Sequence, residues 1–172
     1  MGKEEEQELL EVIRAGYLFR YGDEQDPTFT HKVKDLEAEV MKQFGSKFAL
    51  AVSSGTAALI VAMAAAGIGP GDEVIVPGYT FIASMSSVIA NTAVPVLAEI
   101  DESLTLDPAD VERRITPYTK AILAVHMIGN PCDLDALKKI ADKHKLLLIE
   151  DTAQAFGGLY RGRRLGTLGA IG

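Results

Sequence analysis

Several side chains in this sequence have the types and spacing needed to bind a small charged ligand. The turn at 53–57, Ser-Ser-Gly-Thr-Ala, places hydroxyl groups on either side of a glycine. Asp151 and Gln154 supply a carboxylate and an amide, Phe81 an aromatic ring and His126 an imidazole. Free N–H groups at a small-residue turn that opens a helix favour a phosphate. Together these groups fit a phosphorylated aromatic cation better than any one of them does alone.

Each group also has a plainer interpretation. The turn at 53–57 could be an ordinary capped turn between a strand and a helix, and Asp151 could be a helix N-cap or a surface carboxylate. Phe81 could pack in the core, and His126 could be a hydrogen-bonded interior histidine. The arginine-rich tract 160–164 is typical of a hairpin turn with solvated arginines, with binding of a substrate phosphate as the alternative.

The candidate residues follow segments that are typical of buried strands. Short apolar runs predict strands near 48–52, 73–76, 94–100, 120–126 and 146–150. Helical patterns lie between them near 56–66, 80–91, 108–114 and 134–144, with start signals at Asp107-Pro108 and Asp133. Strands that are apolar on both faces indicate an α/β fold, a mostly parallel sheet flanked by helices. Ligands bind such sheets beyond the carboxyl ends of the strands, where the candidate residues lie.

Composition limits the function further. The chain has 172 residues, with 17 basic and 24 acidic side chains and a net charge of −7. This acidic balance argues against binding to nucleic acid or to an anionic membrane. Turn residues interrupt the uncharged stretches 48–71 and 74–98, so we expect no membrane span, and the acidic start is unlike a signal peptide. We therefore expect a cytoplasmic protein, and we predict no metal site.

The pattern of apolar residues divides the chain into two parts. Two helices near 3–15 and 31–44 predict an N-terminal helical segment over residues 1–44. Short strands alternate with helices after Gly45, which predicts an α/β domain that binds the ligand over residues 45–172. The single cysteine, Cys132, excludes an internal disulfide.

Five motifs in one order carry a family resemblance. The segments 53–59, 69–77, 80–81, 150–155 and 162–167 resemble the DegT/DnrJ/StrS family of pyridoxal-phosphate sugar aminotransferases, which have the aspartate-aminotransferase fold. The resemblance covers nearly the whole chain and implies the large domain of that fold, here incomplete. It implies that Gly55, Thr56 and Ala57 hold the cofactor phosphate through the backbone and that Phe81 stacks on the ring. It further implies that Asp151 pairs with the pyridine nitrogen and that Gln154 hydrogen-bonds the ring hydroxyl.

The resemblance also implies an activity. Family members transfer an amino group from glutamate or glutamine to a keto sugar, often nucleotide-linked, in the synthesis of cell-surface or secondary-metabolite sugars, and a homodimer is expected. Two alternatives remain: a pyridoxal-phosphate-dependent sugar dehydratase with histidine in place of the reactive lysine, and a non-catalytic binding or regulatory relative. Family members are longer, and their Schiff-base lysine and small C-terminal domain would lie beyond Gly172. The 172-residue chain alone is therefore expected to be inactive.

Overall fold

The computed structural model describes residues 2–172. They form two compact units, which divide between Ala51 and Val52. The sequence predicts a boundary after Phe44, at the end of the second helix. Each unit has its own internal contacts, and the second contains the sheet.

The first unit contains the two predicted helices, α1 (Lys3–Ala15) and α2 (Lys32–Phe44). Each helix ends at a glycine in the left-handed conformation, with φ 69° at Gly16 and 68° at Gly45, which a residue without a Cβ adopts at little cost. An ion pair joins the helices, because Lys32 Nζ lies 2.7 Å from Glu11 Oε2. The prediction of two helices is confirmed.

The predicted strand at 48–52 is wrong, because this segment is irregular. Side chains bind its backbone instead of a neighbouring strand: the Ala51 N–H donates to Glu37 Oε1 at 2.7 Å, and Arg20 Nη1 donates to the Ala51 carbonyl at 2.7 Å. The apolar side chains remain outside the core, with Phe48 78% exposed. Apolar composition alone therefore misled the prediction here.

The second unit is built on a four-stranded parallel sheet, as predicted. Its strands are β1 (Glu73–Pro77), β2 (Val94–Ala98), β3 (Thr119–Val125) and β4 (Leu147–Asp151), in the order β2-β1-β3-β4. In the register, Ile75 of β1 is opposite Val96 of β2 and Ile122 of β3. All three strand pairs are parallel, so the carboxyl ends of the four strands lie at one edge.

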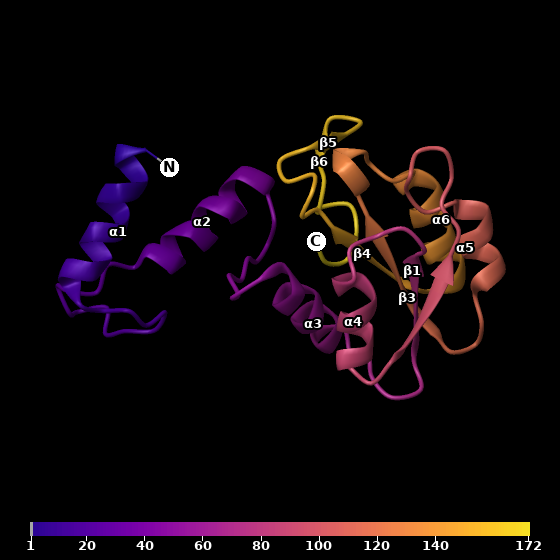
Figure 1. Ribbon diagram of the computed structural model, residues 1–172, viewed down its shortest axis with the longest axis horizontal. Helices are drawn as coiled ribbons and strands as arrows, with labels where there is room; N and C mark the ends of the chain where they lie inside the picture. Colours follow the sequence, from indigo (N-terminus) through magenta and orange to yellow (C-terminus); the bar gives the residue numbers. More distant parts are fainter. Residues whose placement is uncertain (1) are drawn as a thin grey trace. The chain divides into compact units, whose positions relative to one another are not determined.

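Two pairs of helices cover the two faces of this sheet (Figure 1). The pair α3 (Gly55–Ala65) and α4 (Ala83–Ala90) shares a core with Val74 and Val76 of β1. The pair α5 (Pro108–Arg114) and α6 (Leu134–His144) shares the other core with Ile75. Successive side chains of a strand point to opposite faces, so this alternation follows from the period of two. It explains why nearly every strand position is apolar.

Capping residues start the helices at the predicted places. Asp107 accepts the Ala109 N–H at 2.9 Å, and Pro108 is the first residue of α5. Asp133 accepts the Ala136 N–H at 3.1 Å at the start of α6. Side-chain oxygens at these positions satisfy N–H groups that a helix leaves without internal partners.

Three short elements complete the unit. They are the 3₁₀ turn η1 (Met127–Gly129) and the strands β5 (Leu159–Tyr160) and β6 (Arg163–Arg164). The strands β5 and β6 pair antiparallel around Arg161 and Gly162, whose φ angles are 49° and 81°. Positive φ at both turn residues is typical of a tight hairpin, so the predicted hairpin is confirmed. No helix within residues 2–172 is long and apolar enough to cross a membrane.

Candidate active site

Asp151 is the last residue of β4 and lies at the carboxyl edge of the sheet. Its side chain lies on the same face of β4 as that of Ile149, which packs in the core shared with α3 and α4. Asp151 Oδ1 accepts the Ala153 N–H at 3.0 Å, so the carboxylate caps a turn and not a helix. Its second oxygen, Oδ2, has no hydrogen-bond partner within residues 2–172. One oxygen is thus held by the turn and the other is available to a ligand.

Gln154, in the turn that follows Asp151, has a fixed orientation. Its Oε1 accepts the Ile128 N–H at 2.8 Å. A backbone N–H can only donate, so the amide oxygen must face Ile128, and Nε2 remains available to donate elsewhere. Ile128 has φ 55° and ψ 26°, a conformation that costs energy for a β-branched residue. The turn after β3 is therefore strained where it orients Gln154.

The turn before α3 is a capped helix start, and it also has backbone N–H groups that are free to donate. Ser54 Oγ accepts the Ala57 N–H at 3.1 Å. The N–H groups of Gly55 and Thr56 have no partner in the described part of the chain. A Cβ added to Gly55 would meet nothing within 4 Å, so the space beside the turn is open. Of the three residues predicted to bind phosphate, Gly55 and Thr56 present free N–H groups, whereas that of Ala57 is engaged by the cap.

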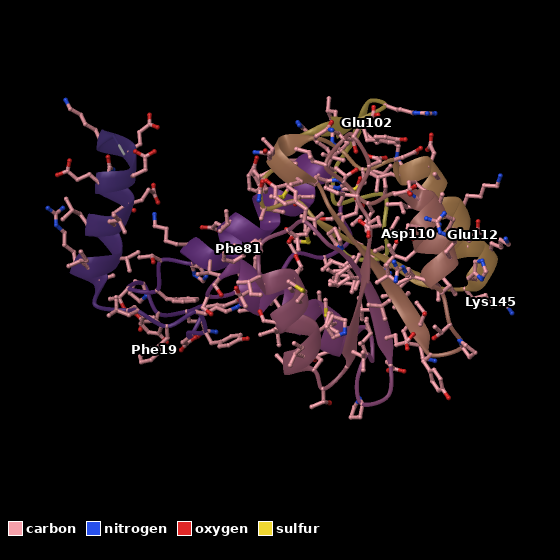
Figure 2. The ribbon with its side chains drawn as sticks, turned by 45° about the vertical axis from the view of Figure 1, so that its right-hand side comes forward. Phe19, Phe81, Glu102, Asp110, Glu112 and Lys145 are labelled. Carbon is pink, nitrogen blue, oxygen red and sulfur yellow. The ribbon has the colours of Figure 1, made fainter. Side chains whose placement is uncertain are left out.

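Phe81 lies between β1 and α4 and is 65% exposed (Figure 2). The alternative that it packs in the core is therefore wrong for this unit. An exposed ring at the carboxyl edge of a parallel sheet has a face available to a ligand. No hydrogen bond within residues 2–172 joins Phe81 or the turn before α3 to Asp151 or Gln154.

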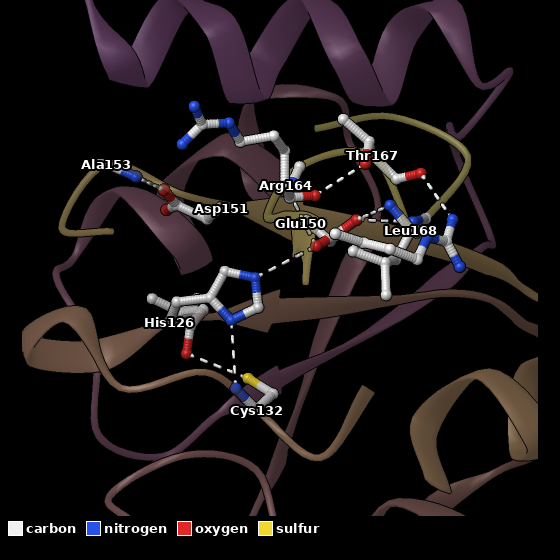
Figure 3. A network of polar contacts seen from close by, with 12 residues as sticks. His126, Cys132, Glu150, Asp151, Ala153, Arg164, Thr167 and Leu168 are labelled. Atoms are coloured by element: carbon white, nitrogen blue, oxygen red, sulfur yellow. Dashed lines mark hydrogen bonds and ion pairs between the residues drawn. The ribbon is translucent and has the colours of Figure 1, made fainter. Parts of the chain in front are cut away.

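His126 is an interior histidine with two fixed hydrogen bonds, and its side chain is fully buried (Figure 3). The Cys132 N–H donates to Nδ1 at 3.1 Å, so this nitrogen carries no proton. Nε2 therefore carries the proton and donates to Glu150 Oε2 at 3.2 Å. Its plainer interpretation is the correct one.

Cys132, His126 and Glu150 are the residue types of a nucleophilic triad, but their geometry excludes that chemistry. The Cys132 thiol donates to the Val125 carbonyl at 3.2 Å, and Nδ1 of His126 faces the amide of Cys132. Burial raises the pKa of the thiol to about 12. A thiol that stays protonated and buried is a poor nucleophile.

Sequence reasoning did not single out Glu150, which is a central polar residue of this edge. It accepts hydrogen bonds from His126 Nε2 and from the N–H groups of Gly166 at 2.9 Å, Leu168 at 2.7 Å and Gly169. Burial raises the pKa of Glu150, and these donors lower it by more, so the pKa lies below its ordinary value. The sequence did contain a signal for a buried acid, because Glu150 directly follows three apolar strand residues.

The hairpin arginines have structural partners. Arg161 Nη1 lies 2.6 Å from Asp135 Oδ2, and Arg164 Nη1 donates to the Gly157 carbonyl at 2.6 Å. These contacts favour the hairpin interpretation over a phosphate site. Within the described residues, no three His, Cys, Asp or Glu side chains gather as metal ligands would.

Comparisons with known proteins identify the family of the chain. The chain matches the DegT/DnrJ/EryC1/StrS aminotransferase family over residues 1–172. An L-glutamine:2-deoxy-scyllo-inosose aminotransferase of Micromonospora echinospora is 56% identical over 121 residues, 70% of this chain and 29% of that protein. The matched part is thus less than a third of the length of that relative.

Solved structures share the fold. The crystal structure of 3-amino-5-hydroxybenzoic acid synthase matches with a TM-score of 0.90 and 37% identity, over 98% of this chain and 42% of that one. The GDP-4-keto-6-deoxy-D-mannose-3-dehydratase of E. coli, solved with bound hydrated PLP, matches with a TM-score of 0.85 and 28% identity, over 98% of this chain and 43% of that one. The chain belongs to the DegT/DnrJ/EryC1/StrS aminotransferase family.

Proposed function

We propose that this chain is the cofactor-binding part of a pyridoxal-phosphate-dependent sugar aminotransferase. The observation that carries the proposal is the pair of available polar groups at the end of β4 and in the turn that follows: the free Oδ2 of Asp151 and the oriented Nε2 of Gln154. The family membership and the 56% identity to an L-glutamine:2-deoxy-scyllo-inosose aminotransferase support the same activity. By that similarity the amino donor is glutamine or glutamate and the acceptor is a keto sugar.

The residues present fit pyridoxal phosphate by the chemistry of their donors and acceptors. The free N–H groups of Gly55 and Thr56, at the positive end of the α3 dipole, suit its phosphate. The exposed ring of Phe81 suits stacking on its aromatic face. Asp151 suits its ring nitrogen, and the Gln154 amide suits its ring hydroxyl.

In this assignment each residue has a defined task. Bound pyridoxal phosphate supplies an electron sink for the carbon that loses its proton. The Asp151 carboxylate holds a proton at the ring nitrogen, which keeps the ring cationic. Gln154 Nε2 donates to the ring oxygen, and its orientation depends on the Ile128 N–H. The backbone of Gly55 and Thr56 fixes the phosphate and so the position of the ring over the sheet edge.

The test uses the full-length protein and a donor labelled with ¹⁵N at the α-amino group. We expect a pyridoxal-phosphate absorbance band in the purified protein and transfer of ¹⁵N to the keto carbon of the acceptor sugar. Loss of a sugar hydroxyl without ¹⁵N transfer would identify a dehydratase instead. Absence of both the band and any turnover would identify a non-catalytic relative and contradict the proposal.

From the family resemblance we also propose a cytoplasmic enzyme that acts as a homodimer. Sedimentation of the full-length protein tests the second of these points, because a monomer at micromolar concentration would contradict it.

A further inference from the structure

Glu150 is buried to an extent that needs explanation, because its side chain has no exposed surface. An ionised carboxylate away from water is costly unless donors replace its hydration. Four donors do so here: His126 Nε2 and the backbone N–H groups of Gly166, Leu168 and Gly169. All four can only donate in this arrangement, so the network requires the ionised form of Glu150.

Three of these donors belong to one segment, residues 166–169, which leads into a fifth parallel partner of the sheet. The Ala170 N–H donates to the Leu148 carbonyl at 2.7 Å, and the Glu150 N–H donates to the Ile171 carbonyl at 2.9 Å. Ile149 and Ile171 form a parallel bridge. A Cβ on Gly169 would lie 2.5 Å from the Leu148 oxygen, so the segment lies directly against β4.

The same network reaches the backbone of Asp151. The His126 N–H donates to the Asp151 carbonyl at 3.2 Å, while the His126 ring donates to Glu150. Figure 3 shows the side chains of Glu150 and Asp151 pointing away from each other. Glu150 therefore binds the structure on one face of β4, and Asp151 presents its free oxygen on the other.

We infer that Glu150 is a positioning residue for the aminotransferase reaction, which holds segment 166–171 and the turn after β3 against β4 and so fixes Asp151 at the sheet edge. The inference rests on the proposed function, because Asp151 is the group that it serves. A displacement of about 1 Å in a reacting group is enough to cost a large part of a rate. Glu150 acts on the chemistry through Asp151 and touches no reacting atom.

A test compares Glu150→Gln with Asp110→Asn in the full-length protein. Asp110 is a matched control because it is also a buried carboxylate: it accepts the Glu99 N–H at 2.8 Å and pairs with Arg113 and Arg114. It lies on α5, remote in sequence from β4 (Figure 2). Both variants lose a buried ionised group, so both should have a lower melting temperature.

The two variants should differ in two other measurements. With Glu150→Gln we expect amide hydrogen exchange of residues 166–171 to accelerate about tenfold or more, and kcat to fall about tenfold with little change in KM. With Asp110→Asn both quantities should stay within about twofold of the parent. Equal exchange and equal kcat in the two variants would overturn the inference and leave Glu150 as a stability residue only.

A second variant covers the case in which Glu150→Gln does not fold. Glu150→Asp keeps the charge and shortens the side chain, and it should recover part of the exchange protection that the parent has. Parent-like exchange and parent-like kcat in Glu150→Asp, whose shorter side chain should weaken the contacts with segment 166–169, would again overturn the inference. Hydrogen exchange needs no cofactor, so it tests the hold on segment 166–171 even if the protein proves not to be an aminotransferase.

Discussion

Glu150 and Asp151 are adjacent carboxylates with opposite surroundings. Four donors surround Glu150, whereas Asp151 has one oxygen in a turn and one without a partner in the described chain. The alternation of side chains along a strand separates the two residues, although the sequence places them side by side. One carboxylate is suited to holding the fold and the other to holding a ligand.

Asp151→Asn should slow the chemical step of the full-length enzyme about 100-fold, or roughly 3 kcal/mol, because the amide cannot keep a proton on the ring nitrogen. The asparagine oxygen can still accept the Ala153 N–H, so the fold should be retained. Single-turnover rates at saturating cofactor measure the effect. Asp107→Asn, which changes another capping aspartate, is the control and should leave the rate unchanged. A rate within about threefold of the parent for Asp151→Asn would contradict the assignment.

Gly55→Val should weaken cofactor binding by about 1 to 3 kcal/mol without unfolding the protein. The position has open space and no positive φ, so the protein itself tolerates the side chain, and the phosphate is the group that it would displace. Gly69→Val, at another open glycine, should leave the cofactor dissociation constant unchanged. Equal affinities in the two variants would show that the turn is only a capped helix start.

The Cys132 thiol should resist alkylation in the native protein at pH 8. Burial raises its pKa to about 12, so almost no thiolate is present at that pH. Labelling with iodoacetamide, followed by mass spectrometry, should modify Cys132 only after denaturant is added. Complete labelling of the native protein within minutes would show that the region around His126 opens readily.

At the scale of elements, the end of α6 offers a simple change in stability. Lys145 is the C-cap with φ 57°, a conformation that glycine adopts without cost. Lys145→Gly should therefore raise the free energy of unfolding by about 0.5 to 1 kcal/mol, as measured by denaturant titration. Lys143→Gly, inside the same helix, should lower it by about 1 kcal/mol. A destabilising effect of Lys145→Gly would mean that its side chain makes a contribution beyond backbone conformation.

The sequence was sufficient to predict elements whose signals are local. Strands β1, β3 and β4 and the caps Asp107 and Asp133 lie where apolar runs and capping residues indicated. The segment 48–52 has a similar apolar pattern but finds no strand to pair with, so it remains irregular. Pairing partners are distant in sequence, and no local pattern reports whether they are available.

The sequence predicted which residue types form the site, but it did not predict the contacts that hold them in place. The roles of Gly55, Thr56, Phe81, Asp151 and Gln154 remain predictions, although each has a group available to a ligand. The contact between Gln154 and Ile128 joins two turns and depends on a positive φ that a β-branched residue seldom adopts. The hold of Glu150 on residues 166–169 is equally non-local, and for this reason the sequence alone did not reveal either contact.

At the scale of the whole molecule, the two buried carboxylates should make the fold sensitive to acid. The pKa of Asp110 is lowered mainly by the Glu99 N–H, and that of Glu150 is lowered because its donors outweigh its burial. Both groups therefore contribute stability that is fully present above their ordinary pKa values, 3.8 and 4.5, and is lost as the pH falls through the lower folded-state values.

Melting temperatures measured from pH 7 down to pH 3 test this dependence. The parent should lose stability steeply below about pH 4.5, because the unfolded chain binds more protons than the folded one. Glu150→Gln and Asp110→Asn should begin with lower melting temperatures and show a shallower decline. An unchanged slope in both variants would mean that other acids control the acid transition.

The strand order has a consequence for how the protein is made. β1 lies between β2 and β3 in the sheet. In the chain, α4, β2 and α5 come between β1 and β3. β3 ends about 50 residues after β1, which corresponds to about 2 to 10 s of ribosomal synthesis. During that interval β1 has been synthesised but its partner β3 has not, so one side of β1 lacks its hydrogen-bonding strand. The valine and isoleucine side chains of β1 are then a target for chaperones that bind nascent apolar segments. The central strand β1 is thus synthesised early, and its pairing is completed only when β3 follows.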